Sequence, residues 1–239
     1  MPNTQAQDVI NRLREYKDDA RGRFLQRFFK TGTGEYAEGD ILWGLSVPQT
    51  RIIAKEFKDL PISQIEKLLH HDIHEVRLCA LIIMTHQVKQ HSQELYDLYL
   101  RSTDCVNNWD LVDTSAPTIM GSYLIDKDRK ILYKLAKSES LWERRIAIVS
   151  TFYFIKREQY EDTLKIAEIL LKDRHDLIHK AVGWMLREMG KNSLDGADQL
   201  EEFLEEYAAV MPRTMLRYAI ERMSAEKKQY YMKKKSQLI

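Results

Sequence analysis

Segments with the apolar spacing of amphipathic helices follow one another along almost the whole chain, separated by short breaks. Apolar residues that recur every three to four positions predict helices that bury one face. Only 9 Gly and 5 Pro occur among 239 residues, so the tight turns that an all-β fold needs are scarce. The pattern predicts an all-α protein with helices at 5–16, 20–30, 48–58, 62–70, 73–89, 92–102, 107–125, 127–137, 141–156, 159–172, 175–190, 195–209, 211–224 and 225–236.

The expected helices form pairs that repeat at a nearly constant distance. Spacings of 35, 32, 35 and 37 residues result when the following positions are placed in register: Leu78, Asp113, Arg145, Lys180 and Arg217. Two-helix units of this length are typical of HEAT and tetratricopeptide repeats, in which equivalent positions line one concave surface. We therefore expect a single HEAT-like repeat domain over residues 1–239, with a less regular region at 1–47 and a concave row of one acid followed by three bases.

The stretch from Thr31 to Pro48, TGTGEYAEGDILWGLSVP, interrupts the helical pattern and contains four of the nine glycines. Its glycines resemble those of a phosphate-binding loop, but the lysine and the preceding strand of such a loop are missing. We therefore expect a connecting loop. A helix is expected to begin at Pro48, because the missing N–H of proline costs nothing in the first helical turn.

The overall charge does not by itself indicate a nucleic-acid-binding protein. The chain has a net charge of +1, and 31% of its residues are charged, which fits solvated outer helix faces. Any basic surface must therefore be confined to one side of the molecule. A solvated charge run is the first interpretation of the C-terminal lysines, and contact with a nucleic-acid backbone is the alternative: Lys227, Lys228, Lys233, Lys234 and Lys235.

The sequence lacks the patterns of a metal or cofactor site, and we expect neither a metal nor a cofactor. Cys79 and Cys105 are not spaced as metal ligands, and the 7 histidines do not form a zinc set. Cys79 lies in the apolar run LCALIIM and is expected to be a buried free thiol. The chain has no signal-peptide pattern and no run of the ~18 apolar residues that a membrane span needs, so we expect a cytoplasmic protein.

The stretch from Asn107 to Gly121, NNWDLVDTSAPTIMG, is the strongest candidate for a functional site. Trp109 and Asp113 are four residues apart, so a helix places the indole and the carboxylate on one face. Pro117 is expected to bend this helix or to end its first part beyond Asp113. A buried aspartate needs a partner, and a ligand is one candidate. The alternative is a core tryptophan beside a salt-bridged aspartate.

Further candidates come from the later repeats. Trp184 follows Lys180 by four residues, and Arg145 and Arg217 occupy the equivalent positions in the repeats before and after that of Lys180. Each alone is most simply a core tryptophan or a solvated arginine. Together, two tryptophans, an aspartate and several cations suit a ligand that carries phosphates and a cationic centre.

These residues resemble the AlkD family of DNA glycosylases, the HEAT-like-repeat DNA alkylation repair proteins. The resemblance covers residues 48–224 and is carried by NNWDLVDTSAPTIMG, ERRIAIVSTF and HKAVGWMLREMGK. It implies that Asp113 is catalytic, that Trp109 and Trp184 bind the deoxyribose and phosphate of the lesion, and that Arg145 supports the site. The region before residue 48 departs from the best-known members, and the resemblance assigns no aromatic residue there.

The resemblance implies a monomeric enzyme that hydrolyses the N-glycosidic bond of cationic N3- or N7-alkylated purines in double-stranded DNA without flipping the base. Lys180 and Arg217, assigned from the repeat register, are expected to contact the DNA backbone. The chemistry agrees, because a carboxylate and indole faces can stabilise the positive charge of an oxocarbenium-like transition state. Two alternatives remain open: a DNA-binding relative without catalytic activity, and a HEAT-like scaffold that binds a partner protein.

Overall fold

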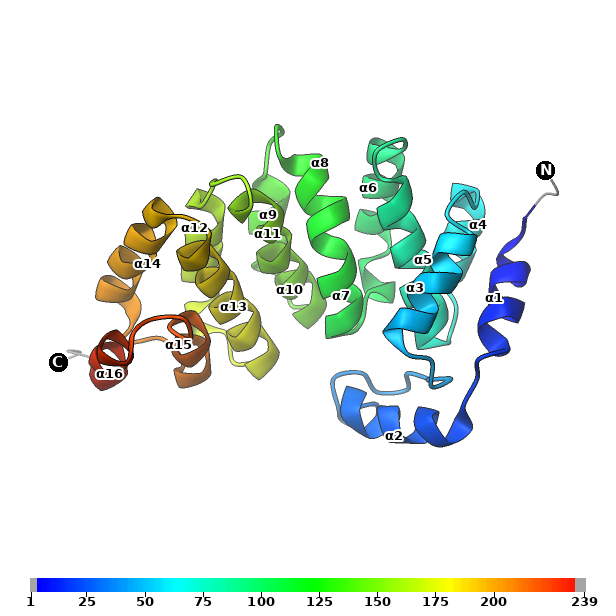
Figure 1. Cartoon of the computed structure of the whole chain (residues 1–239), viewed down its shortest axis with the longest axis horizontal. Coiled ribbons are helices and arrows are strands. Elements are labelled where there is room, and N and C mark those ends of the chain that lie inside the picture. The colour runs from blue at the N-terminus through cyan, green and yellow to red at the C-terminus, as the bar shows by residue number, and fades with distance from the viewer. Residues whose placement is uncertain (1–3, 235–239) are drawn as a thin grey trace. The chain divides into compact units, whose positions relative to one another are not determined.

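The computed structural model describes residues 4–234, which form helices joined by short connections (Figure 1). In chain order the elements are α1 (Ala6–Arg14), α2 (Asp19–Phe29), α3 (Val47–Glu56), α4 (Ile62–Leu69), α5 (His74–Gln87), α6 (Ser92–Arg101), the 3₁₀ turn η1 (Thr103–Cys105), α7 (Trp109–Ala116), the π-helix η2 (Pro117–Gly121), α8 (Ser122–Leu124), α9 (Lys130–Leu135), α10 (Leu141–Ser150), α11 (Phe152–Ile155), α12 (Glu161–Ile169), the 3₁₀ turn η3 (Leu170–Lys172), α13 (Asp176–Asn192), α14 (Leu194–Tyr207), α15 (Arg213–Ala219) and α16 (Ala225–Lys233). No helix in this part of the chain is long and apolar enough to cross a membrane.

The helices expected from the sequence are confirmed, and three of the longer ones are divided. The stretch 107–125 consists of α7, η2 and α8, the stretch 141–156 of α10 and α11, and the stretch 159–172 of α12 and η3. The last expected helix, 225–236, corresponds to α16. Residues 235 and 236 of this expected helix, the first of which is Lys235 of the lysine-rich tail, lie outside the described residues.

The described residues divide into two compact units, one up to Tyr123 and one from Leu124. In the first unit α3 packs against α1 and α5, and α5 also packs against α4 and α7. In the second unit α13 packs against α10 and α15 and against its chain neighbours α12 and α14. Contact of a helix with its hairpin partner and with the equivalent helix of the next pair is the arrangement of helical repeats. The predicted all-α HEAT-like fold is confirmed; the single domain over 1–239 stays a prediction.

Helix α5 is the centre of the first unit. Every residue from His74 to Met84 is buried, as expected for a helix that is enclosed by neighbours on all sides. Cys79 is a buried free thiol, as predicted, and burial raises the pKa of this thiol to about 12. Helix α5 packs against α3, α4 and α7 and so joins the helices of this unit.

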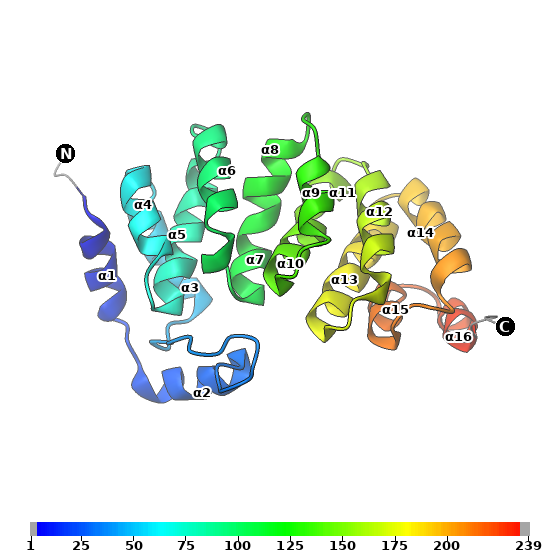
Figure 2. The ribbon, with the colours of Figure 1, turned by 180° about the vertical axis from the view of Figure 1, so that it is seen from behind.

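The glycine-rich segment between α2 and α3 contains no helix, as predicted, yet it is packed into the first unit. The Glu75 carboxylate on α5 accepts hydrogen bonds from the backbone N–H groups of Trp43, Gly44 and Leu45, at 2.9, 2.7 and 3.2 Å. Gly44 has φ of +92°, and a Cβ there would lie 2.3 Å from the Asp18 carbonyl oxygen. The segment therefore fixes α2, which runs across the direction of the other helices of this unit (Figure 2).

Helix α3 begins as the sequence predicts. The Ser46 hydroxyl accepts a hydrogen bond from the Gln49 backbone N–H, and the Gln49 side chain accepts one from the Ser46 N–H, so the two residues form a capping box. Pro48 lies in the first turn of the helix, where its missing N–H leaves no intrahelical bond unmade.

In the second unit, α13 and α15 approach each other closely at Gly183. A Cβ at this position would lie 2.5 Å from the Met215 carbonyl oxygen and 2.5 Å from the Tyr218 Cβ. Real Cβ atoms do not come so near to other atoms, so this contact requires glycine. Lys180 on α13 and Arg217 on α15 line one groove between these two closely packed helices.

Candidate functional site

Trp109 and Asp113 lie on α7, which is anchored by its other side. The Asn108 side-chain oxygen accepts a hydrogen bond from the Trp109 backbone N–H at 2.8 Å and caps the helix. The residues of α7 that hold it in the core are fully or nearly fully buried: Asp110, Leu111, Val112, Ser115 and Ala116. Trp109 and Asp113 are only half-buried, and their spacing of four residues places them on one helix face.

Pro117 divides this helix, as predicted. Helix α7 ends at Ala116, and the backbone from Pro117 to Gly121 is π-helical. Proline has no N–H for the bond to the fourth residue before it, which explains the change of hydrogen-bond pattern at this position. Single π turns inside helices often accompany functional sites. Here the change occurs one turn beyond Asp113.

Helix α2 brings two aromatic rings to Trp109 that the sequence analysis did not assign to the site. The Phe29 ring is stacked on Trp109, with 5.5 Å between ring centroids and 18° between planes. The Phe28 ring meets Trp109 edge-on at 6.0 Å and 76°. Phe29 is 8% exposed, whereas Phe28 is 57% exposed. The available signal was the adjacent phenylalanine pair on the apolar side of an otherwise arginine-rich helix.

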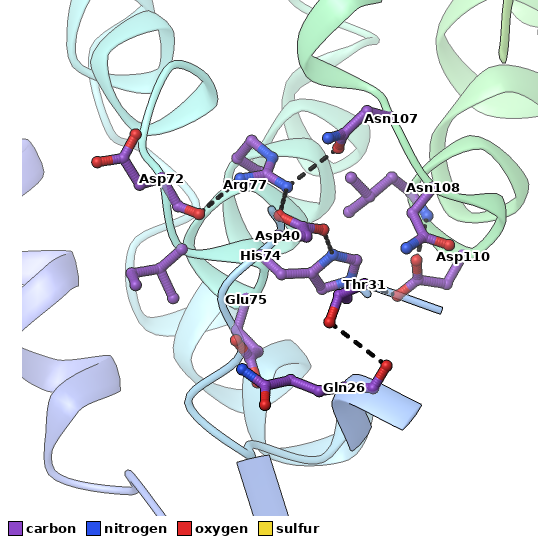
Figure 3. A network of polar contacts seen from close by, with 12 residues as sticks. Gln26, Thr31, Asp40, Asp72, His74, Glu75, Arg77, Asn107, Asn108 and Asp110 are labelled. Carbon is purple, nitrogen blue, oxygen red and sulfur yellow. Dashed lines mark hydrogen bonds and ion pairs between the residues drawn. The ribbon is translucent and has the colours of Figure 1, made fainter. Parts of the chain in front are cut away.

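A largely buried polar network, the His74 network, lies next to the Phe29 ring, whose centroid is 5.0 Å from that of the His74 ring. The network consists of Asp40, His74, Arg77, Asn107 and Asp110 (Figure 3). The His74 Nδ1 lies 2.8 Å from an Asp40 carboxylate oxygen, and its Nε2 lies 2.9 Å from an Asp110 carboxylate oxygen. The Arg77 guanidinium donates to the other oxygen of Asp40 and, at 3.0 Å, to the Asn107 side-chain oxygen.

The electrostatics of the His74 network follow from its composition. Burial by itself lowers the pKa of His74, but the charges of Asp110 and Asp40 and their hydrogen bonds outweigh burial and raise this pKa to about 10. Burial works against the charged form of Asp40 as well, yet His74 and Arg77 together hold the pKa of Asp40 below its ordinary value. The network is therefore two carboxylates balanced by two cations at neutral pH.

In the second unit, Arg145 and Trp184 have different environments. Arg145 is 5% exposed, and its guanidinium donates a hydrogen bond to the Leu177 carbonyl oxygen at 2.6 Å, which ties α10 to the first turn of α13. Trp184 is half-buried on α13 and lies beside Phe152, with 6.0 Å between ring centroids and 34° between planes. Arg145 is thus a buried arginine that holds two helices, and Trp184 is a partly accessible indole.

Lys180 and Arg217 are brought together, as the repeat register predicts for this pair. Both line a groove of about 740 Å³ on the second unit, together with Asp176, Thr214 and Tyr218. The Lys180 ammonium group pairs with the Asp176 carboxylate at 2.7 Å. Arg217 is exposed on α15. Arg145 is not among the residues that line this groove.

Within residues 4–234, no group of three or more His, Cys, Asp or Glu side chains is arranged to hold a metal ion. The two cysteines of the chain are free, one buried and one partly buried.

Two comparisons with known proteins match the chain. The family model described as DNA alkylation repair enzyme matches residues 9–223. Among solved structures, a predicted DNA alkylation repair enzyme from Enterococcus faecalis is similar in fold, with a TM-score of 0.71 and 18% sequence identity, over 87% of this chain and 97% of that chain. No curated protein matches the chain. The family model spans both units and every candidate residue of the site, and the chain belongs to the family of DNA alkylation repair enzymes.

Proposed function

We propose that this protein is a DNA glycosylase that releases cationic N3- or N7-alkylated purines from double-stranded DNA. The observation that carries the proposal is the half-buried Asp113 carboxylate on the same face of α7 as the Trp109 indole, whose edge is met by the exposed Phe28 ring. A carboxylate beside aromatic rings suits a substrate on which positive charge develops.

Hydrolysis of a purine N-glycosidic bond passes through an oxocarbenium-like transition state, in which positive charge builds on the sugar. The ionised Asp113 stabilises this charge and orients the attacking water. The Trp109 indole offers the negative potential of its ring to the same cation. The bond between the sugar C1′ and the base nitrogen breaks, and its electron pair leaves with the base. Water supplies the oxygen of the new bond at C1′ and loses one proton to the solvent.

The leaving base determines which lesions are substrates. An N3- or N7-alkylated purine is already cationic and leaves as a neutral molecule, so it needs no proton from the enzyme. The proposed set contains one carboxylate and no second acid to protonate a neutral base. We therefore expect uracil, hypoxanthine and other neutral bases to remain in the DNA.

We assign Trp184 to contact with the sugar and phosphate of the lesion and Arg145 to support of the site, as the resemblance implies. The partial exposure of Trp184 agrees with contact to a ligand. The buried position of Arg145 and its bond to the Leu177 carbonyl oxygen favour support over direct recognition.

Phosphate contacts are proposed at two places. The groove of the second unit presents Lys180 and Arg217 together. Helix α2 adds exposed cations next to Phe28, on both sides of its exposed aromatic stripe: Arg21, Arg23 and Arg27. Neutralisation of DNA phosphates by such cations releases counterions and makes binding salt-dependent. We propose that the enzyme acts as a cytoplasmic monomer and without a cofactor.

The test is base release from a duplex that contains one N7-methylguanine, compared with a duplex of the same sequence that contains one uracil. Release of methylguanine and retention of uracil supports the proposal. Efficient uracil excision would contradict the assigned mechanism. Salt-sensitive binding of both duplexes without any base release would instead identify a DNA-binding protein without glycosylase activity, and absence of both would favour the protein-binding scaffold.

A further inference from the structure

We propose that His74, held as an imidazolium between Asp40 and Asp110, is a positioning residue that sets the place of Trp109 and Phe28 in the candidate site. The residue touches neither substrate nor water in this role. It acts through the two carboxylates and through the Phe29 ring, and its side chain is 1% exposed.

The charge state follows from the geometry. Both ring nitrogens of His74 lie within hydrogen-bond distance of a carboxylate oxygen, at 2.8 and 2.9 Å. A carboxylate only accepts hydrogen bonds, and a neutral imidazole has only one N–H to donate. With one proton, a nitrogen lone pair would face a carboxylate lone pair in a buried site. Two donated bonds therefore require the imidazolium.

His74 joins three segments that are distant in the sequence. It begins α5, Asp40 comes from the glycine-rich segment that follows α2, and Asp110 lies in the first turn of α7, directly after Trp109. Arg77 adds a second link between the segments, because it contacts Asp40 and Asn107. The neighbouring Glu75 carboxylate bonds the backbone of Trp43, Gly44 and Leu45 and so holds the same segment from another side.

The aromatic contacts continue this linkage to the proposed site. The Phe29 ring lies 5.0 Å from the His74 ring, centroid to centroid, and 5.5 Å from Trp109. Phe29 is therefore enclosed between the imidazolium and the indole, and a cation beside an aromatic ring is attracted to it. Phe28 directly precedes Phe29 on α2, and the two ring centroids are 5.2 Å apart, so displacement of Phe29 would displace Phe28 as well.

A buried ion network of this kind suits positioning better than stability. The free energy needed to remove both charges from water offsets much of the attraction between them. Apolar side chains of the same volume therefore often stabilise a fold equally well. The partners must, however, keep hydrogen-bond distance and direction, because a partner that moves leaves an uncompensated charge. The network thus restricts α2 and α7 to one relative placement. These are the two helices that supply Phe28, Trp109 and Asp113.

The experiment compares the wild type with His74→Gln and with His70→Gln, a matched change at an exposed histidine at the end of α4. All three proteins are labelled with 5-fluorotryptophan, which places one fluorine signal on each of the 4 tryptophans. Trp109→Phe assigns the signal of Trp109. In ¹⁵N-histidine-labelled wild type at pH 8, we expect two imidazole N–H signals for His74, where an ordinary histidine of pKa ~6.5 shows at most one.

We expect His74→Gln to move the Trp109 fluorine signal and to leave the Trp142 and Trp184 signals in place, while His70→Gln moves none of the three. A single imidazole N–H on His74 at pH 8, or an unmoved Trp109 signal in His74→Gln, would overturn the inference. If His74→Gln does not fold, the wild-type nitrogen spectrum and Asp110→Asn, which keeps the shape of Asp110 and removes its charge, decide the same question.

The catalytic readout rests on the proposed function, and the fluorine and nitrogen readouts do not. At saturating protein, single-turnover release of N7-methylguanine by His74→Gln should fall by about 10²-fold, the loss typical of misplaced reacting groups. Unchanged release together with a moved Trp109 signal would contradict a positioning role. Absence of release by the wild type would refute the proposed glycosylase, while the spectra still decide the placement of Trp109.

Discussion

The Phe29 ring is stacked on the Trp109 ring at a centroid distance of 5.5 Å and an interplanar angle of 18°. One face of the indole is therefore occupied by a residue of α2, and a ligand can reach only the remainder. This contact makes the N-terminal region, which the sequence analysis treats as less regular and outside the site, part of the surroundings of Trp109. Phe28, the preceding residue, meets the indole edge-on and remains exposed.

Asp113→Asn tests the role of the carboxylate. The amide keeps the shape of the side chain but removes the charge that stabilises the oxocarbenium-like transition state. Base release from the N7-methylguanine duplex should fall by a factor of roughly 10²–10³, which corresponds to ~3–4 kcal/mol for one electrostatic stabiliser. Single-turnover kinetics give the rate, and duplex binding should survive or tighten. An Asn variant as fast as the wild type would show that Asp113 is not catalytic.

Phe28→Ala tests the contribution of α2 to the site. Loss of a ring that faces a developing cation removes ~1–2 kcal/mol, so base release should fall by about tenfold. Phe24→Ala is the matched control, since Phe24 is also an exposed phenylalanine, one turn earlier on α2. Equal rates of base release by Phe28→Ala and Phe24→Ala would show that Phe28 does not contribute to catalysis.

Lys180→Ala and Arg217→Ala test the phosphate contacts of the second unit. Each change should weaken binding of damaged and undamaged duplex alike and should reduce the slope of log K against log salt concentration by about 1. The measurement is duplex affinity at several salt concentrations. Lys165→Ala, on α12, is the control, because Lys165 pairs with Glu161 of its own helix and does not line the groove. A slope that does not change would exclude a phosphate contact.

Stability should depend on pH through His74. The raised pKa of about 10 means that the folded protein retains a proton that the unfolded chain, with a histidine pKa near 6.5, releases. This contribution is fully present below pH ~6.5, declines as the pH rises and is lost above about 10. The difference in unfolding free energy between wild type and His74→Gln, from urea unfolding at several pH values, should therefore shrink from pH 6.5 to 10. A constant difference would refute the buried imidazolium.

Gly183→Ala should destabilise the second unit. The added methyl group would meet the Met215 carbonyl oxygen and the Tyr218 Cβ, neither of which can move without a shift of α15. We expect a loss of about 1–3 kcal/mol, as for other forced overpacking, measured by urea unfolding. Gly190→Ala is the control: its Cβ would meet chiefly the Cδ2 end of the Leu200 side chain, which can rotate away. An unchanged free energy of unfolding in Gly183→Ala would show that α13 and α15 adjust to the added methyl group at no cost.

The sequence by itself determined the helical architecture and the central motif. Helix positions could be predicted because the apolar period, the scarce glycine and the proline positions act locally, and the structure confirms them from α1 to α16. Local rules also predicted the division of the helix at Pro117 and the shared face of Trp109 and Asp113. The roles of Trp184, Arg145, Lys180 and Arg217 stay predictions that the experiments above test.

Only the tertiary structure decided which distant residues surround that motif. Asp40, His74 and Asp110 are separated by 34 and 36 positions, and nothing in the local pattern of any one of them indicates the other two. The contacts of the Phe29 ring with His74 and with Trp109 likewise depend on the long-range packing of α2 against α5 and α7. Helical periodicity predicts which face of a helix is buried, but long-range packing determines which neighbour covers that face. This packing placed Asp40 of the glycine-rich connecting segment against His74, next to the candidate site.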